Sequence, residues 1–154
     1  KKNGFVLLVK LFGLKAYNLH KNYDDGDRLM ATFAGMLCDT LNAAGSPEDF
    51  VGHLYSDEFC IFTREKKVET ICKTIMVKAE RLLRSFYTPY ELMRGYVTLD
   101  DAKDRGHFYL AEGMIAGVEI PANWDSHYIY IVDLLKDLLK KVELDDAGYR
   151  IMKL

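Results

Sequence analysis

The chain is poor in cysteine, proline and tryptophan, with three cysteines, three prolines and one tryptophan in 154 residues. Cys38, Cys60 and Cys72 show neither metal-ligand spacing nor a CxxC pair, so we expect small buried thiols and a reducing, cytoplasmic compartment. The longest strongly apolar run, Phe5 to Val9, is far shorter than the ~20 residues that span a bilayer, and no signal-peptide pattern surrounds it. We expect no membrane contact by this domain.

An excess of one charge is also lacking, since the formal net charge is -2 and basic and acidic residues are interspersed. Without a basic field, nucleic acid is not expected as a partner. The four histidines show no spacing typical of a metal site and are expected to be ordinary surface or boundary residues. With 49% hydrophobic residues the chain can bury one core, so residues 1–154 predict a single domain. Because residue 1 is not Met and lies close to the first strand, we expect a module excised from a longer multidomain protein.

Hydrophobic periodicity predicts a mixed order of helices and strands. Strands are expected over residues 5–11, 50–55, 59–63, 92–99, 109–120 and 149–154. Helices are expected over residues 14–20, 27–45, 68–86 and 126–142. The segment 22–27 has turn chemistry and is expected to be a loop. This order predicts an α/β (α+β) sandwich, with a central, mainly antiparallel sheet packed against helices.

Two adjacent carboxylates, Asp57 and Glu58, stand at the corner between the two strands of the first expected hairpin. A carboxylate is costly to bury unless it is paired or holds a metal ion. The corner therefore indicates a polar site. The plain alternative is a solvated hairpin tip that has no task.

The corner and its surroundings resemble GGDEF domains, the diguanylate cyclase family. The signature turn corresponds to Tyr55-Ser56-Asp57-Glu58-Phe59, residues 5–18 resemble the first strand and its DxDxFKxxN segment, and Gly26-Asp27 resembles the GD that opens the next helix. Downstream, 113–121 is similar to the strand written SIGIA and 131–140 to the final AD..LY.AK helix. The resemblance covers nearly the whole chain and is weakest over 87–112. It implies a palm-like sheet surrounded by helices and the conversion of two GTP molecules to cyclic di-GMP across a homodimer, with Mg²⁺.

The resemblance implies roles for individual residues. Asn18 and Asp27 match the guanine-reading positions, and an amide with a carboxylate can satisfy the donors and the acceptor on one edge of guanine. Lys140 matches a lysine that contacts triphosphate. Asp57 matches an acidic metal ligand and, with Glu58, supplies the acidic pair of the catalytic site if the enzyme is active. The plain alternatives are that Asn18 merely ends a short helix and that Asp27 caps the next one.

The departures from the family pattern are as informative as the matches. Lys10 stands where active members place their first metal-binding Asp, and we expect it to pair with Asp57 in the place of the metal; alternatively it points outward at a strand end. Tyr55 and Ser56 replace two glycines, so that the Tyr55 ring is expected where ligand would lie. Asp49 is what remains of the RxxD pattern of the inhibitory cyclic di-GMP site, which is expected not to function without its Arg.

Together these features predict a degenerate GGDEF domain of a bacterial cyclic di-GMP signalling protein, inactive or impaired as a cyclase. Such a domain serves as a regulatory or dimerising module that can bind guanine nucleotide. Its expected partners are flanking domains of the same chain and a second copy. Two alternatives stay open: an active, Mg²⁺-dependent diguanylate cyclase, and an interaction scaffold that binds no nucleotide.

Overall fold

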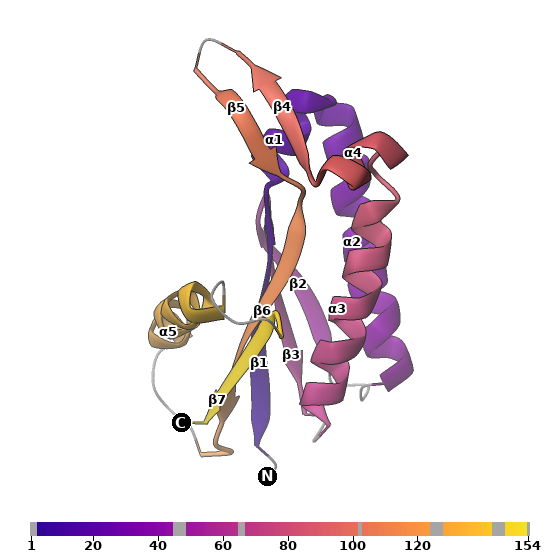
Figure 1. Ribbon diagram of the computed structural model, residues 1–154. Helices are drawn as coiled ribbons and strands as arrows, with labels where there is room; N and C mark the ends of the chain where they lie inside the picture. Colours follow the sequence, from indigo (N-terminus) through magenta and orange to yellow (C-terminus); the bar gives the residue numbers. More distant parts are fainter. Residues whose placement is uncertain are drawn as a thin grey trace.

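A five-stranded sheet organises the computed structural model, which describes residues 3–44, 49–64, 67–101, 103–123, 128–142 and 147–153. The strands are β1 (Gly4–Phe12), β2 (Phe50–Tyr55), β3 (Glu58–Thr63), β4 (Tyr96–Asp100), β5 (Arg105–Tyr109), β6 (Glu112–Ile120) and β7 (Tyr149–Lys153). The helices are α1 (Leu14–His20), α2 (Tyr23–Ala44), α3 (Val68–Arg84), α4 (Pro89–Arg94) and α5 (Tyr128–Val142). The main sheet has the order β2-β3-β1-β6-β7, and β4 pairs with β5 in a separate two-stranded sheet (Figure 1).

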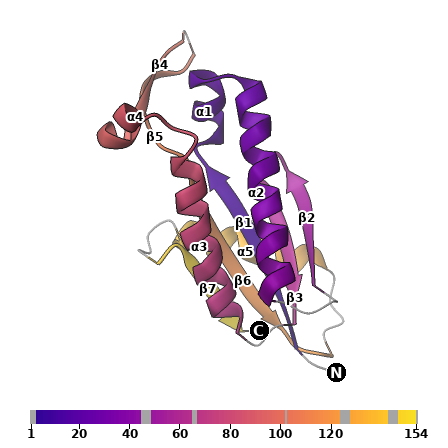
Figure 2. The ribbon, with the colours of Figure 1, turned by 90° about the vertical axis from the view of Figure 1, so that its right-hand side faces the viewer.

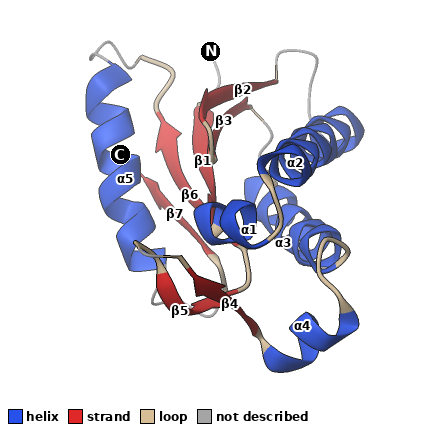
Figure 3. Cartoon of the chain, turned by 90° about the horizontal axis from the view of Figure 1, so that it is seen from above, coloured by secondary structure: helices blue, strands red, loops and turns tan. Residues whose placement is uncertain are grey.

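The side chains of β1 alternate between two cores, because successive residues of a strand point to opposite faces. Leu7, Val9 and Leu11 belong to the core that includes α2 and α3, whereas Leu8 packs with α5. Figures 2 and 3 show α2 and α3 side by side on one face of the sheet and α5 on the other. Only β6 and β7 pair in parallel among the described strands. The predicted α/β sandwich with a mainly antiparallel sheet is confirmed.

The loop expected over residues 22–27 is wrong, because α2 already begins at Tyr23. The side chain of Asn22 accepts a hydrogen bond from the backbone N–H of Asp25 (2.7 Å) and so satisfies a free donor of the first turn. The polar residues that favour a turn also favour a helix N-terminus. Asp27 lies inside this helix, so the alternative that it caps the helix is wrong as well.

The strand expected over residues 92–99 is wrong at its start, where the chain forms α4. Thr88 and Glu91 make a capping box, Pro89 occupies the first helical position, and Gly95 with a φ of 80° ends the helix. The strand expected over 109–120 is divided between the end of β5 and β6. β4 pairs with β5, which begins at Arg105 and so before the strand expected from residue 109. This β4–β5 hairpin extends beyond the main sheet (Figure 1).

The remaining helices agree with their hydrophobic patterns over the described residues. The expected start of the last helix at 126 lies outside those residues, and α5 is described from Tyr128. The burial expected of the cysteines is wrong for Cys38, which is exposed, whereas Cys72 is buried. None of the described helices combines the length and the apolar character needed to cross a bilayer.

Candidate functional site

The acidic corner is a turn formed by Ser56 and Asp57, flanked by Tyr55 and Glu58, which pair across β2 and β3. The backbone N–H of Leu11 in β1 donates to the carbonyl oxygen of Asp57 (2.9 Å) and holds the corner against the central strand. No described residue other than glycine has a positive φ. The corner therefore closes without the glycines that the family signature carries.

Glu58 is buried, with 7% of its surface exposed, and is paired with Lys10. The Lys10 Nζ lies 3.6 Å from Glu58 Oε1 and 5.2 Å from the centre of the Phe12 ring. The expected pairing of Lys10 with Asp57 is therefore wrong. Lys10 and Glu58 lie directly opposite each other on antiparallel strands, which places their side chains on the same face of the sheet.

This pairing also disagrees with two of the plain alternatives. The Lys10 side chain is 29% exposed and contacts Glu58, so it does not simply point outward. Glu58 is buried and so is not part of a solvated tip, whereas Ser56 is exposed and Asp57 is half-buried. Glu58 Oε2 is buried and has no hydrogen-bond partner among the described residues. The carboxylate thus keeps some unused capacity to accept a hydrogen bond.

A groove of about 680 Å³, which we call the base groove, lies between α1, α2 and the corner. Asn18 in the last turn of α1, Asp27 in α2 and Asp57 in the corner all line it. The sequence places these three residues far apart, and the fold brings them to one groove. His53 of β2 lines the same groove and stacks on Phe59, with ring centres 4.6 Å apart.

The amide of Asn18 sits close against the backbone of α2. Its Oδ1 atom is buried and has no hydrogen-bond partner among the described residues. A Cβ atom added to Gly26 would lie 1.6 Å from this Oδ1, so Gly26 leaves the space that the amide occupies. The Asn18 amide oxygen is therefore turned toward Gly26 and has no hydrogen-bond partner there among the described residues.

The Tyr55 ring does not fill the base groove, contrary to expectation. It is 61% exposed and lies 5.3 Å from Lys136 Nζ of α5, on the opposite side of the sheet from α2. The pairing of β2 with β3 is irregular between His53 and Tyr55. Such an irregularity breaks the simple alternation of faces, so the two side chains need not point the same way. Lys140, in the next turn of α5, is exposed and lines neither the base groove nor the groove beside it.

A second groove of about 330 Å³ continues from the base groove, with which it shares Leu14, Lys15 and Asp57. Lys10 and Asp104 also line it. Lys15 Nζ lies 3.4 Å from Asp104 Oδ1. Both lysines of this second groove therefore contact a carboxylate, Lys10 on Glu58 and Lys15 on Asp104.

Asp49 has a structural contact of its own. Its carboxylate accepts hydrogen bonds from the Thr63 hydroxyl (2.8 Å) and from the backbone N–H of Arg64 (3.1 Å), at the end of β3. Residues 46–48, where the family pattern has its Arg, lie outside the described part of the chain. These contacts give the Asp49 carboxylate a structural role that requires no inhibitory ligand.

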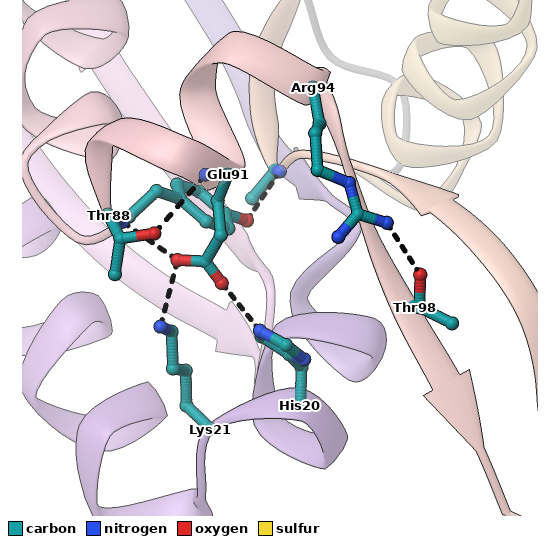
Figure 4. Close-up of polar contacts among 8 residues, drawn as sticks. His20, Lys21, Thr88, Glu91, Arg94 and Thr98 are labelled. Atoms are coloured by element: carbon teal, nitrogen blue, oxygen red, sulfur yellow. Dashed lines mark hydrogen bonds and ion pairs between the residues drawn. The ribbon is translucent and has the colours of Figure 1, made fainter.

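A polar cluster that the sequence did not reveal ties α1 to α4 (Figure 4). The Glu91 carboxylate accepts hydrogen bonds from Lys21 Nζ (2.9 Å) and from the Thr88 backbone N–H (2.7 Å), and it contacts His20 Nε2. Burial by itself raises the pKa of Glu91, but hydrogen bonds from Thr88, Lys21 and His20 outweigh it and lower that pKa to about 2. The Thr-Pro-x-Glu sequence of the capping box was the available signal.

The residues present do not fit Mg²⁺. This ion takes oxygen ligands in near-octahedral geometry and usually relies on carboxylates. The described residues include no cluster of three or more His, Cys, Asp or Glu side chains that could hold an ion. One of the two carboxylates of the corner already pairs with the Lys10 ammonium, which carries the wrong charge for a ligand.

A mainly antiparallel sheet covered by helices on both faces, with an acidic corner between β2 and β3, is the fold of a GGDEF domain. No family model and no curated protein matches the sequence, but solved GGDEF structures match the fold. The GGDEF domain of DgcB from Caulobacter crescentus, in complex with c-di-GMP, is 12% identical, with a TM-score of 0.62 over 98% of this chain and 77% of that chain.

Two longer proteins contain the same fold. Diguanylate cyclase SiaD from Pseudomonas aeruginosa, in complex with its activator SiaC, is 11% identical with a TM-score of 0.65, over 99% of this chain and 50% of that chain. The S helix-GGDEF-EAL part of Vibrio cholerae LapD, bound to c-di-GMP, is 14% identical with a TM-score of 0.62, over 97% of this chain and 30% of that chain. The chain thus spans half or less of these two neighbours.

Proposed function

We propose that the chain is a degenerate GGDEF domain of a bacterial cyclic di-GMP signalling protein. Its cyclase reaction is lost or impaired, and it works as a regulatory or dimerising module within a longer chain. It binds guanine nucleotide in the base groove, where Asn18 and Asp27 read the base. DgcB and LapD hold c-di-GMP, and SiaD is bound to its activator. These neighbours support the proposed signalling role and the proposed binding of a partner.

The observation that carries the proposal is a contrast within one site. The two base-reading positions line an open groove of about 680 Å³, as binding of a purine requires. The strand position of the first metal ligand instead holds Lys10, paired with Glu58 at 3.6 Å. Metal ions supply much of the charge stabilisation in phosphoryl transfer, so a cation at this position impairs the reaction while leaving base recognition in place.

The test combines a binding assay with a product assay. Isothermal titration calorimetry with GTP is expected to give saturable heat that ATP does not give and that Asn18→Ala with Asp27→Ala removes. Incubation of a full-length, dimer-competent chain with GTP and Mg²⁺ is expected to yield no cyclic di-GMP. Product formation would establish an active cyclase instead. Absence of heat up to about 1 mM nucleotide would leave only a scaffold role.

A further inference from the structure

We propose that the base groove takes guanine nucleosides and nucleotides without a divalent ion, and that its affinity does not rise with the number of phosphates. This inference rests on the proposed function, because it assumes that the groove binds guanine. It adds the class of ligand: the base and its sugar are recognised, whereas a metal–triphosphate group is not. Three observations lead to it, one from each part of the site.

The first observation is that an ammonium group occupies the position where a metal would be held. Lys10 Nζ lies between Glu58 Oε1 at 3.6 Å and the Phe12 ring at 5.2 Å, and the side chain is 29% exposed. A divalent ion at Glu58 would have to displace this ammonium or stand beside it. Like charges this close in a partly buried site repel strongly. The Lys10–Glu58 pair therefore excludes the ion and already neutralises the carboxylate.

The second observation is the charge balance of the second groove, which adjoins the base groove and shares Leu14, Lys15 and Asp57 with it. Lys10 contacts Glu58, and Lys15 contacts Asp104 at 3.4 Å. Asp57 borders both grooves and adds a negative charge. A phosphate chain that entered this groove would have to compete with carboxylates for each of these lysines, and Asp57 would repel it. Phosphates in this groove therefore bring little affinity.

The third observation is that the base end keeps its recognition groups. The Asn18 Oδ1 atom is buried and has no hydrogen-bond partner among the described residues, and Gly26 leaves room for this amide. Asp27 lines the same groove from α2. A base that reads Asn18 has to draw this amide out toward the groove, and the hydrogen bond that then forms relieves the desolvation cost that the oxygen carries against Gly26. Affinity is thus concentrated on the base.

Calorimetry on the unmodified chain tests the ligand class directly. Guanosine, GMP and GTP are each titrated in Mg²⁺ and again in excess EDTA. We expect dissociation constants that EDTA changes by less than about twofold, and guanosine binding at least as tightly as GTP. A GTP affinity that falls about tenfold in EDTA, or that exceeds the guanosine affinity about tenfold, would overturn the inference.

A charge reversal tests the role of Lys10. Manganese alone, followed by its paramagnetic resonance signal, is expected not to bind the unmodified chain. Lys10→Asp is expected to bind it and to make GTP binding sensitive to EDTA. Lys73→Asp makes the same substitution on the exposed face of α3 and is expected to change neither property. Manganese binding to the unmodified chain, or none to a folded Lys10→Asp variant, would contradict the exclusion.

Circular dichroism establishes whether each variant is folded. If Lys10→Asp does not fold, Lys10→Asn removes the cation without adding a charge, and weak manganese binding is then expected. The outcomes separate the two proposals. Guanine binding that requires Mg²⁺ overturns this inference and leaves the proposed function standing. No binding of guanosine or GTP under any condition overturns both, because neither survives without a guanine site.

Discussion

Gly26→Ala is the sharpest test of how the base groove is built. The added Cβ would lie 1.6 Å from Asn18 Oδ1 and 2.7 Å from its Cγ, so the amide has to rotate away. The side chain can yield, because the contacts are with its mobile end and not with backbone. A displaced rotamer costs about 0.5–1.5 kcal/mol, whereas replacing glycine inside a helix gains about 0.5–1 kcal/mol. The free energy of unfolding should change little.

Guanine binding should change much more. Loss of the Asn18 hydrogen bonds is expected to cost about 1–3 kcal/mol, since a buried polar partner on the base is then left unpaired. That range corresponds to a dissociation constant raised about fivefold to about 150-fold. Calorimetry with guanosine measures the affinity, and urea unfolding measures the stability.

Gly35→Ala is the matched control in the same helix. A Cβ at Gly35 has no neighbour within 4 Å, so the substitution should stabilise the fold by about 0.5–1 kcal/mol and leave guanosine binding unchanged. Unaltered guanosine binding by Gly26→Ala would show that Asn18 does not read the base. A loss of stability above about 3 kcal/mol would show that the amide cannot move, which would refute the reasoning about its contacts.

Two further predictions concern other parts of the site. Tyr55→Ala should lower the free energy of unfolding by less than about 1 kcal/mol, because the ring makes only an exposed contact with Lys136. Guanosine affinity should stay unchanged. A clear rise in that affinity would place the Tyr55 ring in the base groove. Glu91 has a folded-state pKa of about 2, below its ordinary 4.5, so its stabilising effect is present above about pH 5 and is lost toward pH 2. The free energy of unfolding of the unmodified chain should fall by about 3 kcal/mol between about pH 5 and pH 2 through this group, and this fall should be absent in Glu91→Gln. The same pH dependence in both proteins would contradict the role of Glu91.

The elements predicted well from sequence are those whose burial repeats regularly. Helix α3 carries an apolar stripe with Ile71, Cys72 and Ile75 buried, and that stripe is visible in the sequence because one face of the helix packs on the sheet. The errors fall where the same residue types suit two local structures. Asn22 and the acidic residues after it favour a turn and a helix N-terminus equally. Proline is compatible both with the end of one helix and with the first turn of the next, and Pro89 begins α4.

The candidate site was predictable in part, because the spacing of the family motifs fixes which strand and helix carry each residue. That Lys10 pairs with Glu58 rather than Asp57 depends on the register of β1 against β3, which composition does not specify. The outward position of Tyr55 depends on one irregular step in the β2–β3 pairing. The Glu91 cluster joins residues about 70 positions apart, His20 and Lys21 with Glu91, and no local pattern reveals such a contact.

The central place of β1 in the sheet bears on how the site forms during synthesis. The residues that line the base groove lie between Leu14 and Phe59, and Lys10 with its partner Glu58 falls in nearly the same stretch. On the other side of β1 stand β6 and β7, which come from the second half of the chain. Since chains emerge from the ribosome with the N-terminus first, every residue that lines the base groove is available before the strands of the second half have been made. Changes in the later half therefore alter the support of the groove and not the residues that line it.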